Sequence, residues 1–549
     1  MPLQKNQLLN LQIERLSNDG SGVAHSEDGE AVFIPGTAPG DTARVRIVKD
    51  CGRYAFGILD ELLTPSPDRI PVDCPAAGPC GGCSLRHLRY EAELSAKQDN
   101  VTDAFRRIGG LEVPILPALA SPEVDRYRNK VQFPVGRDKA GKPCIGFYAG
   151  RTHRIVPCPD CKLQPSLLNA IGNTLCAFFD AHRIQPYDEQ SGKGLVRHIF
   201  LRRGAHSGQI MVCLVCTRPK IPHSDELVQQ LCAQFPEITT ILLNVNAKDT
   251  NVILGHETLS LYGPGFIEDT LQGVPVRLGP LSFYQVNTLA AEQLYRIAAD
   301  YAQLTPNDLL LDLYCGMGTI GLSMVDSCRE LIGVEIVPEA IDSAKANAAR
   351  MGDAVAAKSR FFCADAGQAA TQLAAEGLHP DVIILDPPRK GCDEATLSAV
   401  VKMSPRRVVY VSCNPSTAAR DAKWLTAHGY HAEKVQPVDL FPRTKHCECV
   451  IALSKGEIDS KKVRVEFSLE GMDTSGLQKG ATYPEIKARV LEQTGLKVSS
   501  LYISQVKQKC GLEVRENHRK AKSENAKQPQ CPPEKEAAIR DALKYFKML

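Results

Sequence analysis

The sequence predicts a multidomain α/β protein with an N-terminal OB-like β-barrel, a central α/β insert, a Rossmann-like parallel-sheet domain and a small helical C-terminal extension. Three observations predict this class. The 549 residues exceed what one hydrophobic core usually holds. Residues 1–64 alternate short strand-like stretches with glycine turns. After residue 300, apolar runs end in glycine, carboxylate or cysteine residues, as at the ligand-binding edge of an open α/β sheet.

The barrel prediction rests on four evenly spaced strand-like stretches, at residues 9–13, 31–34, 42–47 and 54–59. Glycine turns such as Asn18-Asp-Gly20-Ser-Gly22 separate them. This pattern is typical of small OB-like barrels, many of which bind oligonucleotides.

Composition places the chain among ordinary globular proteins. Hydrophobic residues make up 43% and charged residues 23% of the sequence. No apolar run is long enough to cross a bilayer, and the N-terminus lacks a signal-peptide pattern. Twenty cysteines without such a pattern indicate reduced thiols, so we expect a cytoplasmic monomer that does not associate with membranes. The net charge of +2 leaves room for a local basic patch.

A single cysteine follows the most informative apolar run. The run, residues 408–411, continues as Ser412-Cys413-Asn414-Pro415. Because ligands bind at the ends of strands in open α/β sheets, we expect Cys413 at the mouth of a nucleotide-type pocket. A lone cysteine in this place can also be a small buried hydrophobic residue, but the neighbouring motifs favour covalent chemistry.

Two further strand ends predict a cofactor pocket. An apolar strand breaks into Asp312-Leu-Tyr314-Cys-Gly316-Met-Gly318-Thr319, and a helix-like stretch follows over residues 320–325. The next apolar strand, residues 331–337, contains Glu335, whose carboxylate can accept hydrogen bonds from ribose hydroxyls. A dinucleotide is one interpretation. Only two of the three glycines of a dinucleotide fingerprint are present, so S-adenosylmethionine (SAM) is favoured.

A third strand end favours methylation of carbon. The stretch Asp381-Val-Ile-Ile-Leu-Asp386-Pro-Pro-Arg389 is a buried strand that closes on a carboxylate and two prolines. Methyltransferases that act on exocyclic amines commonly have Asn-Pro-Pro-aromatic here. In this chain Asp386 and Arg389 replace the asparagine and the aromatic residue.

Carbon methylation of a pyrimidine explains a reactive cysteine. Uracil C5 is a poor nucleophile, but thiolate addition at C6 makes an enolate whose C5 can attack a methyl sulfonium. A general base must then remove the C5 proton. Glu448, at the start of the final apolar strand, is our candidate for the base, and His446 is the second candidate.

A group of cysteines nearer the N-terminus predicts a metal site. Cys74, Cys80 and Cys83 stand among glycines and prolines, and Cys158 or Cys161 can supply a fourth thiolate. Such a set suits an iron–sulfur cluster or a tetrahedral zinc ion. Because a methyl transfer is redox-neutral, a cluster here would act as a structural clip or as an element that contacts RNA.

The motifs at Cys413, Asp386 and Asp312, together with Phe283-Tyr-Gln285-Val-Asn287, resemble those of the RNA uracil-5 methyltransferases. The resemblance runs from about residue 8 to 455 and is strongest with the iron–sulfur 23S ribosomal RNA branch. It implies that Cys413 is the nucleophile and Glu448 the base. It implies SAM contacts at Gln285, Tyr314, Glu335, Asp365 and Asp386.

The same resemblance implies a TRAM domain at residues 1–64, with a [4Fe–4S] cluster bound by Cys74, Cys80, Cys83 and Cys161. Cys158 is then an extra thiol. The cluster segment would cover residues 65–100, with its fourth ligand from residues 158–161. A central RNA-binding domain would follow at residues 101–280, with Arg128, Lys130 and Arg197 as RNA contacts, and a SAM domain at residues 281–455.

The expected activity is methylation of C5 of a uridine in RNA, most specifically 23S rRNA. A tRNA uracil-C5 methyltransferase and a non-catalytic RNA-binding ribosome-assembly factor are the alternatives. An RNA cytosine-C5 methyltransferase is disfavoured, because the Pro-Cys and Thr-Cys contexts typical of those enzymes do not occur around Cys413.

Residues 456–549 lie beyond this resemblance and are basic, with 18 Lys and Arg against 13 Asp and Glu. We expect helices over residues 483–494 and 499–509, a linker at residues 529–533 and a terminal helix after it. The first two helices suggest a helix-turn-helix. A helical module that packs on the enzyme is the other interpretation.

Overall fold

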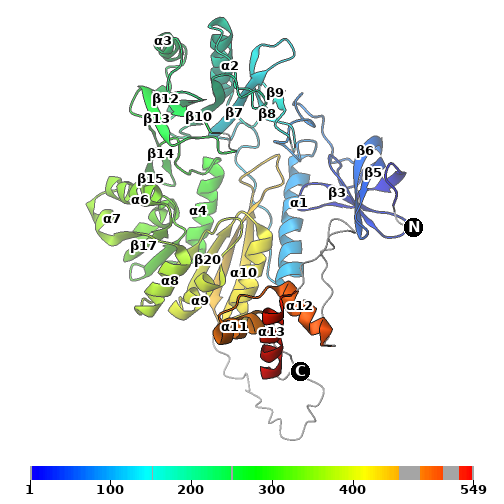
Figure 1. Ribbon diagram of the computed structural model, residues 1–549. Coiled ribbons are helices and arrows are strands. Elements are labelled where there is room, and N and C mark those ends of the chain that lie inside the picture. Colours follow the sequence, from blue (N-terminus) through cyan, green and yellow to red (C-terminus); the bar gives the residue numbers. More distant parts are fainter. Residues whose placement is uncertain (1–2, 151, 249–250, 457–482, 511–530, 547–549) are drawn as a thin grey trace. The chain divides into compact units, whose positions relative to one another are not determined.

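The computed structural model describes residues 3–150, 152–248, 251–456, 483–510 and 531–546. The chain divides into two units, Met1–Asp459 and Ser460–Leu549, and each is described by itself. The first unit contains three larger sheets and one hairpin, and the helices of the second are labelled with the rest in Figure 1.

The N-terminal strands form a six-stranded sheet in the order β1-β5-β6-β4-β3-β2. In β5 the side chains alternate between partly exposed and buried over most of its length, as in a strand with one face on a core. All four predicted strands are present, and β2 and β3 are additional short strands. The strands are β1 (Leu8–Gln12), β2 (Arg15–Leu16), β3 (Gly22–His25), β4 (Ala31–Ile34), β5 (Thr42–Asp50) and β6 (Tyr54–Thr64).

The cysteine-rich segment leads into a long helix, α1 (Tyr90–Asp103), which continues as the π-helical turn η1 (Ala104–Gly109). Figure 1 shows α1 running beside the sheet formed by residues 309–455, which we call the catalytic sheet. Buried residues of α1 and η1, such as Val101 and Phe105, belong to the same apolar core as that sheet. The predicted cluster segment therefore ends in a helix that packs on the domain in which Cys413 lies.

The central residues form a seven-stranded sheet in the order β13-β12-β11-β10-β7-β8-β9. Helix α2 buries an apolar face that includes Phe178 and Phe179 in the core of this sheet. A hairpin of β14 and β15 then leads toward Gln285. The remaining bounds are β7 (Lys130–Arg137), β8 (Pro143–Tyr148), β9 (Ile155–Pro157), α2 (Ser166–Ala181), β10 (Val196–Arg203), β11 (Ile210–Cys216), α3 (Ser224–Gln234), β12 (Ile238–Val245), β13 (Glu257–Tyr262), β14 (Ile267–Leu271) and β15 (Val274–Leu278).

The catalytic sheet has the order β18-β17-β16-β19-β20-β22-β21. Its first five strands are parallel, and β22 runs antiparallel between β20 and β21. The strand order reverses at the β16–β19 junction, where open α/β sheets bind ligands. The strands are β16 (Leu309–Leu313), β17 (Glu330–Glu335), β18 (Ser359–Cys363), β19 (Val382–Leu385), β20 (Arg407–Ser412), β21 (Tyr430–Val438) and β22 (Glu448–Lys455).

Helices cover both faces of this sheet (Figure 1). Apolar residues of α4, α5 and α6 belong to the core on one face, and those of α8, α9 and α10 to the core on the other. The predicted helix-like stretch after Gly318 is shorter than expected, because α5 ends at Ser323 and a 3₁₀ turn follows. The helices are α4 (Thr288–Ala302), α5 (Thr319–Ser323), α6 (Pro338–Arg350), α7 (Asp353–Lys358), α8 (Ala366–Ala375), α9 (Glu394–Met403) and α10 (Pro415–Ala427).

The second unit contains α11 (Tyr483–Thr494), α12 (Ser500–Lys509) and α13 (Pro533–Tyr545). The three predicted helices are confirmed, and Ser499 caps α12 by accepting a hydrogen bond from Tyr502 N. Apolar side chains of the three helices, among them Ile503 and Ile539, form a core of their own. Residues 529 and 530 of the predicted linker lie outside the described residues, and α13 begins at its last residue, Pro533.

Candidate active site and thiol cavity

Cys413 lies directly after β20 and before α10, at the carboxyl edge of the parallel strands. Pro415 begins α10, and the Asn414 side chain accepts a hydrogen bond from Ser416 N at 3.2 Å. The turn is tight because the Ser412 hydroxyl also accepts from Asn414 N. This local geometry leaves the Cys413 side chain half-buried at the strand end, as the sequence predicts.

Three charged side chains act on the Cys413 thiol. Burial raises the pKa of Cys413 above its ordinary value, and the carboxyl groups of Glu448 and Asp386 raise it further. The Arg389 guanidinium opposes this shift through its charge and a hydrogen bond. The structure therefore brings together the predicted nucleophile, the predicted base and the Asp386-Pro-Pro-Arg389 motif.

Glu448 is the first residue of β22, and Cys449 beside it pairs with Ser412 at the end of β20. The antiparallel pairing explains how residues far apart in sequence meet at one edge of the sheet. The Glu448 side chain is buried, and burial raises its pKa to about 8, with a further contribution from Asp386 and opposition from Arg389. Burial also raises the pKa of Asp386, to about 7.

His446, the second candidate for the base, lies in the loop just before Glu448. Burial lowers its pKa to about 4, and Arg389 and Lys445 add to this shift. A neutral imidazole at neutral pH can accept a proton only weakly when its pKa is this low. Glu448 is the better base on electrostatic grounds.

A cavity of about 210 Å³ opens beside Cys413. Its lining includes Arg389, Asn414, Lys445 and His446 from the catalytic domain. Two more lining residues come from elsewhere: Asn18 from the barrel turn between β2 and β3, and Asn100 from α1. Sequence reasoning missed both, because no local pattern connects an asparagine in a turn with a cysteine almost 400 residues later.

The cofactor motif places its side chains around the end of β16. The Glu335 carboxylate accepts hydrogen bonds from the backbone N–H groups of Gly316, Ile336 and Val337, at 2.9–3.1 Å. These bonds fix the loop after β16 to the end of β17. Tyr314 has a left-handed backbone, with φ of 66°, which is uncommon for a residue other than glycine.

Asp365 and two exposed apolar side chains extend this edge. Asp365 caps α8 by accepting from Gln368 N at 3.1 Å, so one carboxylate oxygen has a structural role. Ile336, directly after β17, is 60% exposed, and Phe362, in the edge strand β18, is 42% exposed. Exposed apolar side chains next to carboxylates suit a flat, polar-edged ring such as adenine.

Gln285 lies in the loop between β15 and α4, and its backbone carbonyl accepts from Asn129 Nδ2 at 2.7 Å. Asn287, two residues later, caps α4 and donates from Nδ2 to the Leu440 carbonyl at 3.1 Å. The Phe283–Asn287 motif is therefore tied to the loop that precedes Glu448.

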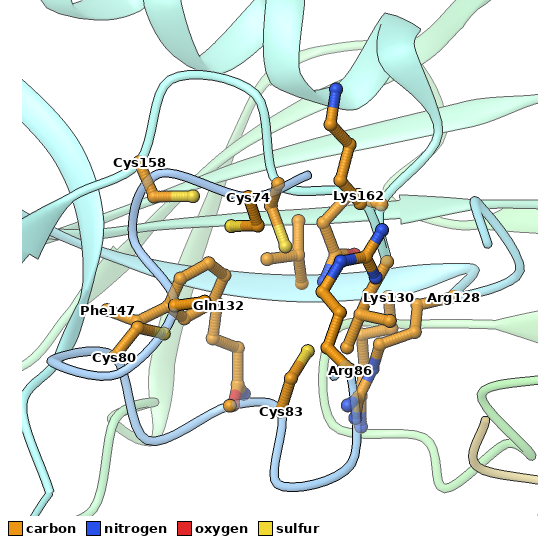
Figure 2. A pocket seen from close by; sticks show the side chains of 16 residues that line it. Cys74, Cys80, Cys83, Arg86, Arg128, Lys130, Gln132, Phe147, Cys158 and Lys162 are labelled. Carbon is orange, nitrogen blue, oxygen red and sulfur yellow. The ribbon is translucent and has the colours of Figure 1, made fainter. Parts of the chain in front are cut away.

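The predicted metal site is a cavity of about 240 Å³. Five thiols line it, and four of them (Cys74, Cys80, Cys83 and Cys158) can be followed in Figure 2, where their sulfur atoms point inward. Cys161 is the fifth. The cavity also has a cationic wall made of Arg86, Arg128, Lys130 and Lys162.

The spacing of the sulfur atoms separates two kinds of metal site. Four thiolates on one zinc ion, at bonds of about 2.3 Å, lie about 3.8 Å apart. Among the described residues, three ligand atoms within 4.8 Å of one another occur at His182, His223 and Glu226, whereas no three of the five thiols meet that limit. The cavity is therefore wider than a single zinc ion requires, and its all-sulfur donor set fits an iron–sulfur cluster.

One expected RNA contact is wrong. The Arg197 guanidinium is buried and donates to the backbone carbonyls of Asn246 and Lys248, at 3.1 and 2.6 Å. It also lies over the Tyr187 ring. Its charge is used inside the central domain, so it cannot reach RNA. Arg128 and Lys130 instead line the thiol cavity, where burial, Arg202 and Arg128 lower the pKa of Lys130 to about 8.

Comparison with known proteins agrees with this site. A family model described as tRNA (Uracil-5-)-methyltransferase matches residues 89–456, and a TRAM domain model matches residues 2–59. The chain belongs to the tRNA (uracil-5-)-methyltransferase family. It is therefore an RNA methyltransferase with a SAM-dependent fold, and its N-terminal barrel is a TRAM domain. Residues beyond 456 lie outside the family model.

Relatives within this family cover most of the chain. An uncharacterized RNA methyltransferase of Bacillus cereus is 40% identical over 457 residues, which are 83% of this chain and 98% of the relative. A relative of the same description from Listeria monocytogenes is 42% identical over 451 residues, 82% of this chain and 98% of that protein.

A solved structure shares the fold. The tRNA (uracil-54, C5)-methyltransferase of Pyrococcus abyssi, in complex with S-adenosyl-L-homocysteine, superposes with a TM-score of 0.64 at 25% identity. The superposition covers 81% of this chain and 100% of the Pyrococcus abyssi chain. None of the helices in the described parts of the protein is both long and apolar enough to span a membrane.

Proposed function

We propose that the protein transfers a methyl group from SAM to C5 of a uridine in RNA, through a transient bond between Cys413 Sγ and C6 of the base. The observation that carries this proposal is the meeting of Cys413, buried Glu448 and Asp386 at one edge of the catalytic sheet. The cavity beside Cys413 gives the base a place to bind once it has left its stack.

Each residue has a defined task in this scheme. The Cys413 thiolate adds to C6, and the electron pair of the C5–C6 bond becomes nucleophilic at C5. SAM would supply an electrophilic methyl group to C5, with cleavage of its S–CH3 bond and release of S-adenosylhomocysteine. Glu448 then removes the C5 proton, the C5–C6 double bond reforms and the thiolate leaves. Arg389 stabilises the thiolate, because its charge lowers the pKa of Cys413 against the effect of burial.

The SAM site is proposed at the ends of β16, β17, β18 and β19. In this site the Glu335 carboxylate would accept hydrogen bonds from the ribose hydroxyls. Ile336 and Phe362 would offer apolar faces to the adenine ring, with Asp365 at its polar edge. Tyr314, Asp386 and Gln285 are proposed at the methionine end. The left-handed backbone at Tyr314 supports a constrained role for this loop.

The thiol cavity is proposed to bind a [4Fe–4S] cluster through Cys74, Cys80, Cys83 and Cys161. The all-thiol donor set, in which no three ligand atoms lie within 4.8 Å of one another among the described residues, supports this assignment over zinc. We expect about four iron atoms per chain and a broad visible absorption band after anaerobic purification. Cys83→Ser lowers the iron content, whereas Cys363→Ser, which changes an exposed thiol outside the cavity, does not. Stoichiometric zinc without iron contradicts the cluster.

The RNA substrate is proposed to be 23S ribosomal RNA. The cluster thiols and the TRAM domain support this class by analogy with the iron–sulfur branch. Transfer RNA is the second candidate, because the Pyrococcus abyssi enzyme with a shared fold acts on uridine 54 of tRNA. Mapping 5-methyluridine in total RNA from cells with and without the protein separates the two.

Two variants test the covalent scheme. Cys413→Ala removes the nucleophile, so we expect loss of methyl transfer from labelled SAM with RNA binding retained. Glu448→Gln leaves the thiol but removes the base, so a covalent RNA–protein adduct accumulates on ordinary uridine RNA and is seen as a shifted band on a denaturing gel. Cys232→Ser, which changes a partly exposed thiol of α3 in the central domain, is the matched thiol control and stays active. Methyl transfer by Cys413→Ala contradicts the scheme.

A further inference from the structure

One loop, residues 439–446, receives hydrogen bonds from four distant parts of the chain. We call it the base loop, because it follows β21 and, after Cys447, leads to Glu448 at the start of β22. Its last residue is His446, which lines the cavity beside Cys413. Whatever fixes the base loop therefore fixes the candidate base against the nucleophile.

The thiol segment holds the base loop at Arg443. The backbone N–H groups of Ser84 and Leu85 both donate to the Arg443 carbonyl, at 3.0 and 3.1 Å, and Ser84 follows Cys83 directly. Arg443 has a left-handed backbone, with φ of 68°. A non-glycine residue keeps this conformation only when its surroundings impose it. Here the surroundings are the residues next to a cluster thiol.

Helix α1 holds the other end of the base loop through buried ions. Lys97 Nζ donates to Asp439 Oδ1 at 2.7 Å and to the Phe441 carbonyl at 3.2 Å. Glu93 accepts from Lys97 and from Arg443 N, each at 2.7 Å. All three ionic side chains, Lys97, Glu93 and Asp439, are at most 1% exposed. This buried ionic group therefore holds the base loop firmly to α1. Helix α1 in turn follows the cysteine-rich segment directly in the chain.

Tyr127 also connects the thiol cavity with the base loop. Its hydroxyl donates to the Pro442 carbonyl at 3.0 Å. Its ring belongs to the same apolar cluster as Cys158 and Cys161, with Cys74, Cys80 and Cys83 packed against it. One side chain thus contacts the lining of the thiol cavity and the backbone of the base loop.

We infer that the thiol segment positions the catalytic base: Ser84, Leu85 and Tyr127 transmit the conformation of the cysteine cavity to the base loop, and so to His446 and Glu448. This inference rests on the proposed function for the role of Glu448. It would give the proposed metal site a task in a redox-neutral reaction, because ligation of Cys83 would restrain the adjacent Ser84 and Leu85. These three residues are positioning groups and take no part in bond changes.

Hydrogen exchange tests the coupling without any substrate. Exchange into peptides that cover residues 438–447 is compared between the protein as purified and the protein stripped of metal by an oxidant and a chelator. We expect at least a tenfold faster exchange of these amides after stripping, with β16 and β17 unchanged. Equal exchange in the two samples overturns the inference. Because no RNA is present, this result is independent of whether uridine is the substrate.

Tyr127→Phe tests the same coupling by removing one oxygen atom. We expect kcat to fall about tenfold while the KM for SAM and the affinity for S-adenosylhomocysteine stay unchanged. Tyr148→Phe is the matched control, because its hydroxyl faces His198 in the central domain and not the base loop. A Tyr127→Phe enzyme with unchanged kcat overturns the inference. If this variant loses cofactor affinity through misfolding, the exchange measurement decides.

Discussion

The raised pKa of Glu448 has two opposite effects on its action as a base. Its side chain is buried beside Asp386, which raises its pKa to about 8. A carboxyl group with this pKa is mostly protonated at neutral pH and cannot accept another proton. Once deprotonated, however, it is a far stronger base than an ordinary glutamate. The same burial that costs ionisation therefore favours removal of the C5 proton.

This electrostatic environment predicts a pH dependence. Since the folded pKa of Glu448 is raised, deprotonation increases as pH rises, and we expect release of methylated RNA from the covalent adduct to accelerate about tenfold per pH unit up to about pH 8. The measurement is the decay of the adduct band after rapid mixing at fixed pH values. Adduct formation in Glu448→Gln, which depends on Cys413, serves as the control. A release rate that is flat between pH 6.5 and 8 contradicts Glu448 as the base.

Arg197 illustrates how a single residue can mislead sequence reasoning. An arginine beside a histidine and aromatic residues is typical of an RNA-binding strand, yet its guanidinium is paired with backbone carbonyls of a distant loop. Strand alternation gives the face on which a side chain lies but not which loop closes over that face. Arg128 and Lys130, in contrast, do line the thiol cavity.

Helix α1 is joined to the base loop by ionic side chains that are at most 1% exposed. Burial opposes the charge on Lys97, but Glu93 and Asp439 outweigh it and raise the Lys97 pKa. Burial also raises the pKa of Glu93, to about 7, despite the attraction of Lys97. The Lys97 ammonium group therefore lies between the two carboxyl groups and stabilises the negative charge of both. Such buried groups fix a geometry more than they add net stability.

Removing the cation alone should therefore be severe. We expect Lys97→Met to lower the free energy of unfolding of the first unit by about 3–5 kcal/mol, because Asp439 loses its buried counter-charge and Glu93 keeps only the Arg443 guanidinium, at 3.7 Å. Urea denaturation followed by tryptophan fluorescence measures this change, since the sole tryptophan, Trp424, packs against the catalytic core.

A compensated variant distinguishes charge from shape at this group. Lys97→Met combined with Glu93→Gln and Asp439→Asn removes all three charges, and we expect it to recover a large part of the lost stability. A triple variant that is less stable than Lys97→Met would show that packing around the lysine, and not its charge, holds α1 to the base loop.

The strand ends of the catalytic sheet could be predicted because each is a local signal. The apolar runs before Asp312, Asp386 and Cys413 mark buried parallel strands, and topology then brings their ends to one edge. The contacts across the molecule could not be predicted. Lys97 and Asp439 are separated by 342 residues, and no periodicity connects a helix with a loop at that distance.

The described residues of the second unit, 483–510 and 531–546, have a hydrophobic core of their own. Its buried side chains come from α11, α12 and α13 and the residues beside them. The family model ends at residue 456, and the match to a relative at 40% identity takes 457 residues of this chain and covers 98% of that relative. The catalytic apparatus described above lies entirely before residue 456.

We therefore expect a protein that ends at residue 456 to keep methyl transfer. Its kcat/KM on a short uridine-containing RNA should lie within about twofold of the full chain, and its melting temperature within a few degrees, because no core residue of the catalytic sheet is removed. Filter-binding assays with labelled SAM and a thermal melt check this. A tenfold loss of kcat/KM on the short RNA would assign the C-terminal helices a part in catalysis.

The antiparallel direction of β22 has a practical consequence for work on this protein. The strand starts at the edge where Cys413 lies, with Cys449 opposite Ser412, and finishes at the reverse edge, with Ser454 opposite Arg407. A polypeptide that is joined after Lys455 therefore leaves the sheet at the edge opposite Cys413. An affinity handle or a fluorophore attached there leaves the approach of a large nucleic acid open, which makes this junction the natural place to tether the enzyme for single-molecule observation.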